Sequence, residues 1–138
     1  MNKTILVTAM FIGATAVLLG AFGAHGLEKL VDAPAVDTFG TGTTYQMYHA
    51  FFLMFLGLLP SVSVRTKKVV FYTVLLGIIL FSGSIYGLAT NSLTDFDFKK
   101  IGFLTPLGGS LLIFAWIYMG IRIFLDQKSI KIQSEATD

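Results

Sequence analysis

Tyr45, Gln46 and His49 are the residues whose types and spacing are best suited to chemistry. They stand at positions i, i+1 and i+4, so a helix places them on one face, with His49 one turn further along. A histidine within an apolar segment is costly and usually faces the interior of a helix bundle, which makes His49 a candidate for a functional site. The structural alternative is a hydrogen bond between helices, from His49 to Ser82, to Ser84 or to a carbonyl at the glycine-rich end of the first apolar segment.

Metal binding and catalysis find little support in the residue types. His25 and His49, together with Glu28 or Asp32, match no known metal-binding spacing, and a chain without cysteine has neither thiolate ligands nor thiol nucleophiles. Acid–base catalysis at His49 needs a second titratable group nearby, but the apolar segments contain no carboxylate. We therefore expect a non-enzymatic protein with no metal and no cofactor.

The composition predicts that these residues are positioned by helices in a lipid bilayer. Of the 138 residues, 54% are hydrophobic and only 13% are charged, which is too few charges to cover a water-soluble surface. The mean hydropathy of +0.76 agrees. The net charge of +2 is small and the basic residues are scattered, which excludes the basic patch that nucleic-acid binding requires.

Four apolar runs have the length of membrane-spanning helices, which are about 20 residues long. The runs are approximately Ile5 to Ala24, Thr44 to Val64, Val69 to Thr90 and Phe103 to Phe124. Because only helices and closed barrels satisfy the backbone in lipid, we predict an all-α, four-span transmembrane bundle of up-down-up-down topology over residues 1–124. The first run is longer than the core of a signal peptide, so we interpret it as an uncleaved span.

The connecting segments are more polar than the spans. We expect a turn at Gly40-Thr41-Gly42 and a short interfacial helix over Leu27 to Val31. Thr105 before Pro106 is predicted to cap the last span. The tail over residues 125–138 is polar and is predicted to be mobile.

The distribution of basic residues predicts the orientation. Seven lie on one side of the predicted bundle and three on the other, namely Lys3, Arg65, Lys67, Lys68, Arg122, Lys128 and Lys131 against Lys29, Lys99 and Lys100. By the positive-inside rule, both termini are expected in the cytoplasm. Aromatic residues at the inner boundary are expected to be Tyr72, Trp116 and Tyr118, and those at the outer boundary Tyr45, Tyr48 and Tyr86.

Small residues recur at a spacing that lets membrane helices pack closely. The residues predicted to serve this packing are Gly13, Gly20, Ala24, Gly83, Gly87, Gly108 and Gly109. We interpret them as packing within one bundle rather than as a dimer face.

In the predicted topology, the polar residues converge near the outer leaflet. This cluster is a candidate site for a lipid, a small apolar molecule or a partner helix, and its members are His25, Tyr45, Gln46, His49, Ser82, Ser84, Tyr86 and Thr105. Two alternatives remain open: a small transporter or channel subunit acting as a homo-oligomer, and a structural accessory subunit whose polar residues serve only packing.

Four segments resemble the signature blocks of a known family of small bacterial membrane proteins, the YwdK/YgdD type with a domain of unknown function numbered 423. The segments are Gly20 to Leu27, Thr44 to Ala50, Phe81 to Tyr86 and Leu104 to Gly109. The resemblance covers about Met1 to Phe124 and implies a multi-pass protein of the bacterial cytoplasmic membrane. It implies no activity or ligand, and the segment Asn91 to Gly102 is longer here than the family pattern.

Overall fold

The computed structural model describes the backbone of residues 1–135 and the side chains of residues 1–125. Over this range all regular secondary structure of the chain is helical. Its α-helices are α1 (Lys3–His25), α2 (Ala33–Leu58), α3 (Val64–Ala89) and α4 (Leu104–Glu135), and its short 3-10 helices are η1 (Leu27–Lys29), η2 (Asn91–Leu93) and η3 (Phe98–Ile101).

Polar side chains cap the first three helices. Asn2, Asp32 and Ser63 each accept a hydrogen bond from a backbone N–H in the first turn of α1, α2 and α3 respectively. Such caps satisfy amides that have no partner within the helix. The sequence between the helices therefore fixes where each of these helices begins.

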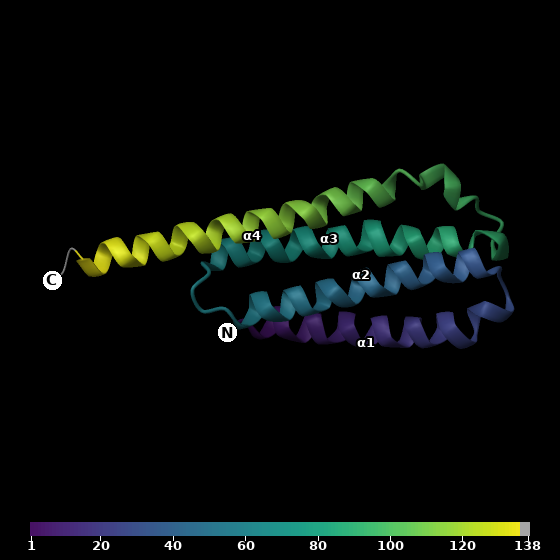
Figure 1. Ribbon diagram of the computed structural model, residues 1–138, viewed down its shortest axis with the longest axis horizontal. Helices are drawn as coiled ribbons and strands as arrows, with labels where there is room; N and C mark the ends of the chain where they lie inside the picture. Colours follow the sequence, from purple (N-terminus) through teal and green to yellow (C-terminus); the bar gives the residue numbers. More distant parts are fainter. Residues whose placement is uncertain (136–138) are drawn as a thin grey trace.

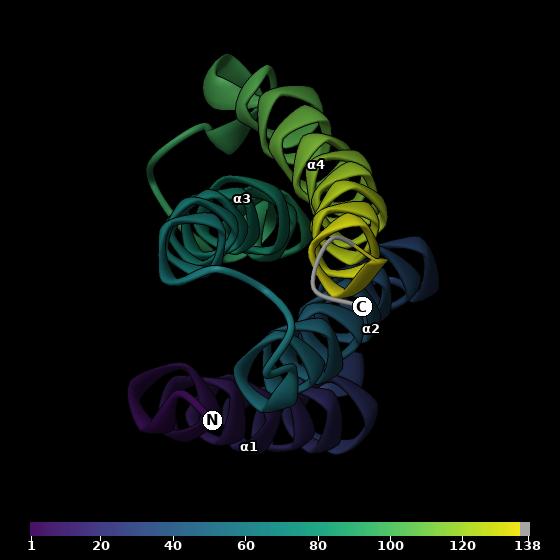
Figure 2. The same cartoon turned by 90° about the vertical axis from the view of Figure 1, so that its left-hand side faces the viewer.

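Consecutive helices pack side by side in opposite directions (Figure 1). At one end, the N–H of Asn2 donates to the carbonyl of Gly57 at 2.9 Å, which joins the start of α1 to the end of α2. At the other end, the hydroxyls of Ser84 and Thr105 join the end of α3 to the start of α4 at 2.7 Å. Viewed along the helices, α2 lies between α1 and the α3–α4 pair (Figure 2).

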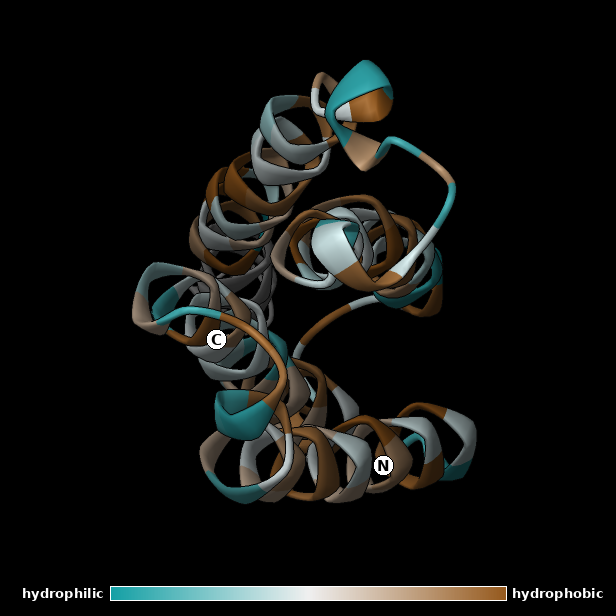
Figure 3. Cartoon of the chain, turned by 90° about the vertical axis from the view of Figure 1, so that its right-hand side faces the viewer, coloured by the Kyte–Doolittle hydropathy of each residue, from teal (hydrophilic) through white to brown (hydrophobic). Residues whose placement is uncertain are grey.

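The surface of the helices is apolar. Leu53, Leu56, Val74 and Ala115 are fully buried in the core, but large side chains such as Phe11, which is 69% exposed, point outward. Figure 3 shows hydrophobic residues along the helices and hydrophilic ones gathered at the turns. Such an outward apolar surface is expected where lipid rather than water is the solvent.

Three segments are long and apolar enough to cross a membrane: Lys3–Lys29, Val64–Ala89 and Phe98–Leu125. They correspond to α1, α3 and α4. The helix α2 is not among them, because it contains several threonines as well as Gln46 and His49.

Helix α2 differs from the expected second segment at both ends. It begins at Ala33 rather than Thr44 and ends at Leu58 rather than Val64. The predicted turn at Gly40-Thr41-Gly42 is wrong, because this tripeptide lies within α2. Thr38, Thr41 and Thr43 donate their hydroxyl hydrogens to carbonyls three or four residues earlier, which makes these residues compatible with a helix. Pro60 follows the last turn and stops the helix.

The other boundaries also shift. The short helix expected over Leu27 to Val31 is the 3-10 helix η1. Helix α4 continues past Phe124 to Glu135. The tail over residues 125–138, which was predicted to be mobile, lies largely outside the residues whose side chains the structure describes.

The glycines differ in how closely they approach a neighbouring helix. A Cβ added at Gly108 would lie 2.4 Å from the backbone nitrogen of Phe81, so α3 and α4 touch through their backbones there. Gly87 and Gly109 face the rings of Phe98 and Phe81, whereas Gly13 contacts Ala50 at an ordinary distance and Gly20 and Gly83 face open space. Ala24 is exposed. Close contacts also occur at four glycines outside the predicted set, namely Gly23, Gly42, Gly57 and Gly77.

Candidate functional site

Gln46 joins three helices. Its Nε2 donates to the carbonyl of Ile12 at 3.0 Å and to the hydroxyl of Thr15 at 2.9 Å, both on α1. Its Oε1 accepts a hydrogen bond of 2.8 Å from the hydroxyl of Tyr86 on α3. The side chain is only 6% exposed. The amide therefore uses both of its ends to bind neighbouring helices, which is the usual role of a buried polar group in a membrane bundle.

This contact lies near the middle of the bundle rather than in its outer third. Ile12 and Thr15 are central in α1 (Lys3–His25), so Gln46 is level with the midpoint of that helix. The predicted position of Gln46 was wrong because α2 begins at Ala33 and so extends further toward the end of the bundle opposite the N-terminus than expected. As a result, Gln46 and His49 lie deeper in the bundle.

Ser82, Ser84 and Thr105 also hold helices together. Ser82 donates to the carbonyl of Gly42 at 2.9 Å, which joins α3 to α2. Ser84 donates to the carbonyl of Phe81 and shares the 2.7 Å contact with Thr105. Neither serine bonds to His49, so the predicted histidine–serine contact is wrong. The hydroxyl of Thr105 meets Ser84 on α3 rather than an amide of its own helix.

His49 instead pairs with Trp116 of α4. The indole N–H of Trp116 donates to Nε2 of His49 at 3.3 Å, while Nδ1 lies 2.7 Å from the carbonyl of Tyr45. An indole nitrogen can only donate, so Nε2 accepts and Nδ1 carries the hydrogen. The imidazole is therefore neutral in this arrangement. Trp116 was expected at the inner boundary of the membrane. It instead lies against His49, and the two side chains connect α4 to α2.

The side chains of two members of the predicted cluster form none of these hydrogen bonds. His25 is exposed at the end of α1, and none of the described residues forms a hydrogen bond with its side chain. Phe39 on α2 packs on Gly23, which lies close to His25 in α1. The helical rise along α2 from Phe39 to His49 therefore puts His49 roughly 15 Å deeper in the bundle than His25. Tyr45 is 43% exposed, and its ring packs on Phe81 with centroids 5.1 Å apart. No group of three histidine or carboxylate side chains gathers within residues 1–125.

His49 and Tyr45 border a cavity between α2 and α4. Its volume is about 330 Å³. The residues that line it are Tyr45, His49, Phe81, Gly109, Leu112, Ile113 and Trp116. Four of these were not singled out from the sequence: Phe81, Leu112, Ile113 and, as a pocket residue, Trp116.

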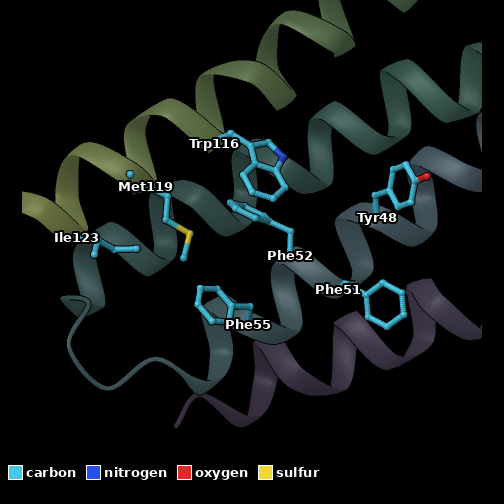
Figure 4. Close-up of a pocket in the computed structure, with 8 residues that line it drawn as sticks. Tyr48, Phe51, Phe52, Phe55, Trp116, Met119 and Ile123 are labelled. Atoms are coloured by element: carbon cyan, nitrogen blue, oxygen red, sulfur yellow. The ribbon is translucent and has the colours of Figure 1, made fainter.

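A second, more apolar cavity of about 440 Å³ continues between the same helices toward the end of the bundle that carries the N-terminus (Figure 4). Trp116 lines both cavities, and its ring packs against that of Phe52 with centroids 4.3 Å apart and planes tilted by 37°. We call the two together the α2–α4 groove. The residues lining its inner part are Tyr48, Phe51, Phe52, Phe55, Trp116, Met119, Gly120 and Ile123. Sequence reasoning missed this part, although Phe51 and Phe55 stand one turn apart and Gly120 leaves space.

A bundle of apolar helices that exposes large hydrophobic side chains and bonds its polar groups internally is a membrane protein. Residues 19–109 match the model of a family described as a protein of unknown function, DUF423. The chain belongs to this family.

Its relatives are also called membrane proteins. The UPF0382 membrane protein SSP2132 of Staphylococcus saprophyticus is 35% identical over 122 residues, which cover 88% of this chain and 98% of the relative. The UPF0382 membrane protein YwdK of Bacillus subtilis is 34% identical, with coverage of 83% and 91%. The UPF0382 inner membrane protein YgdD of Escherichia coli is 35% identical, with coverage of 86% and 87%. No solved structure matches the chain.

Proposed function

We propose that the chain crosses the bacterial cytoplasmic membrane four times, with both termini in the cytoplasm. The segments containing α1, α3 and α4 have the length and composition of spans, and α1 and α3 run in the same direction. Helix α2 connects the far end of α1 to the near end of α3, so it must cross as well if its neighbours do. Its polar side chains bond to α1, α3 and α4, which lowers their cost in lipid.

The charges support this orientation, and a relative supports the choice of membrane. Lys3, Arg65 and Lys68 lie in the first turns of α1 and α3, at the end that carries the N-terminus. Lys29 and Lys99 lie in η1 and η3, at the opposite end. Basic residues favour the cytoplasmic side of a membrane. The relative from E. coli is named as an inner membrane protein.

We infer further that the protein is not an enzyme and that the α2–α4 groove binds the hydrocarbon chain of a lipid or another amphipathic molecule. The groove itself carries this proposal: it is lined by aromatic and aliphatic side chains and borders only a few polar groups, those of His49, Tyr45, Tyr48 and Trp116. A site with apolar walls and few polar groups suits such a ligand. Gln46, Ser82 and Ser84 already have partners in neighbouring helices.

The length of the groove fits one chain. Tyr45 to Phe55 on α2 and Gly109 to Ile123 on α4 correspond to roughly 15 to 20 Å of helix. One leaflet of the hydrocarbon core is about 15 Å thick. A single acyl chain can therefore lie along the groove.

Trp116 provides the test because it is the single tryptophan of the chain and lines the groove. A brominated fatty acid, added in small amounts to the protein in neutral detergent, is expected to quench Trp116 fluorescence in a saturable manner. Unlabelled fatty acid should relieve the quenching. Quenching that rises linearly and resists competition would refute binding in the groove.

Two glycines give a matched pair of variants. Gly120 lines the groove and Gly83 does not, and both are exposed within helices with no atom within 4 Å of an added Cβ. The variant Gly120→Leu fills the groove and is expected to abolish saturable quenching, whereas Gly83→Leu should retain it. Equal behaviour of the two variants would contradict the proposal.

A structural role is the second candidate, and the hydrogen bonds of Gln46, Ser82 and Ser84 between helices favour it. In that case His49→Gln lowers the melting temperature, and saturable quenching of Trp116 is absent from the wild-type protein. The quenching experiment thus separates the two candidates.

A further inference from the structure

A polar cavity lies at the end of the bundle opposite the N-terminus, separate from the α2–α4 groove. Its volume is about 590 Å³. It is open to the surface and is bordered by η1, the start of α2, the end of α3, η2 and η3. The residues that line it are Lys29, Leu30, Val31, Asp32, Ala35, Leu88, Ala89, Asn91, Ser92 and Lys99.

Hydrogen-bond donors without a protein partner converge on this cavity. Lys29 and Lys99 come from η1 and η3, and neither forms an ion pair within residues 1–125. The Oδ1 of Asn91 accepts the N–H of Phe98 at 2.6 Å, which leaves the amide hydrogens of Asn91 without an acceptor in that part of the chain. The hydroxyl of Ser92 has no partner there either. Three segments, η1, η2 and η3, therefore contribute donors to the cavity.

Asp32 is the one acidic residue that lines the cavity, and it already has a structural role. Its Oδ1 accepts the N–H of Ala35 at 3.0 Å and so caps α2. Two lysines and one aspartate thus line the cavity, and the aspartate is bonded to its own helix. The balance of charge in the cavity is positive.

We propose that this cavity binds a phosphate group, either as a free anion or as part of a lipid headgroup. Lysines act as point charges toward phosphate, and a tetrahedral oxyanion accepts hydrogen bonds from several directions at once. The amide of Asn91 and the hydroxyl of Ser92 complete a set of donors of different geometry. The cavity lies where the apolar part of α3 ends, which is the level expected for headgroups in the proposed topology. The proposal does not depend on the groove.

Thermal unfolding in a neutral detergent tests the free anion. Inorganic phosphate is compared with chloride at equal ionic strength, for the wild type and for the double variant Lys29→Gln/Lys99→Gln. The control variant is Lys68→Gln/Lys100→Gln, which removes the same charge from exposed lysines outside the cavity. Phosphate is expected to raise the melting temperature of the wild type and of the control, and the apparent affinity should fall at least about tenfold in the cavity variant.

Native mass spectrometry tests the lipid source. Nanodiscs of phosphatidylcholine with a small fraction of phosphatidylglycerol supply the headgroup, and the number of retained phosphatidylglycerol molecules is counted for the same three proteins. A lipid retained by the wild type and the control but lost from the cavity variant assigns the phosphate to a lipid. The proposal is overturned if neither probe distinguishes the cavity variant from the control.

Discussion

Trp116 on α4 donates its indole N–H to Nε2 of His49 on α2, and this hydrogen bond joins the two helices that border the groove. The contact fixes which nitrogen of His49 carries hydrogen. It also holds the aromatic ring of Trp116 over Phe52. The same pair therefore supports the bundle and forms part of the wall of the proposed binding site.

Trp116→Phe keeps an aromatic ring and removes the donor. We expect the free energy of unfolding to fall by about 0.6 kcal/mol, and at most about 1.7 kcal/mol, which is the range for hydrogen bonds between membrane helices. Unfolding is followed by circular dichroism, since the variant lacks tryptophan. In a His49→Leu background the same substitution should cost less. An equal cost in both backgrounds would show that the two side chains are not coupled.

Tyr86→Phe removes the hydroxyl that donates to Oε1 of Gln46 and retains the ring that packs on Phe39. The expected loss of stability is again about 0.6 to 1.7 kcal/mol. Tyr72→Phe is the control, because Tyr72 is 65% exposed and its hydroxyl has no bond within residues 1–125. Equal melting temperatures for the two variants would argue against the hydrogen bond of Tyr86.

Gly108→Ala places a methyl group against the backbone of α3, where a Cβ would lie 2.4 Å from the nitrogen of Phe81. Overpacking of this kind costs about 1 to 3 kcal/mol. Gly83→Ala, in open space, should leave stability unchanged or raise it by up to about 1 kcal/mol because alanine favours helix. Denaturation of both variants in the same detergent checks the difference, and a neutral effect of Gly108→Ala would mean that α3 and α4 are further apart.

The chain contains no cysteine, so single cysteines report on topology without background. Ser61 and Asp95 are exposed and lie in the connections that follow α2 and α3 respectively. A membrane-impermeant maleimide added to intact cells or spheroplasts is expected to label Asp95→Cys, whereas Ser61→Cys should react only after the membrane is opened. Labelling of Ser61→Cys from outside would contradict the four crossings or their orientation.

The apolar runs of α1, α3 and α4 could be recognised from the sequence because lipid selects uninterrupted hydrophobic segments. Helix α2 could be recognised only in part. Gly40 to Gly42 has the composition of a turn, and nothing local indicates that the neighbouring threonines bond back to the helix. The pairing of Gln46 with Thr15 and Tyr86, and of His49 with Trp116, depends on helix register across long separations in sequence.

The candidate site, like helix α2, could be predicted only in part. Its polar residues stand out in apolar segments, which led to His49 and Tyr45. The inner part of the groove consists of phenylalanines and aliphatic residues that resemble any lipid-facing surface. This part of the groove exists because Gly120 has no side chain and because the side chains of Phe55 and Ile123 do not meet across it (Figure 4). Such a gap depends on how the helices pack and cannot be read from the sequence.

The dependence of Gln46 on partners from two other helices has a consequence for how the chain enters the membrane. During synthesis α1 emerges first, so Ile12 and Thr15 are present when Gln46 arrives, whereas Tyr86 follows later. We expect α2 to be inserted together with α1 as a helical hairpin, since its polar half is poorly suited to enter lipid alone. The last hydrogen bond of Gln46 then forms only when α3 docks, which makes assembly of the bundle a step that follows insertion.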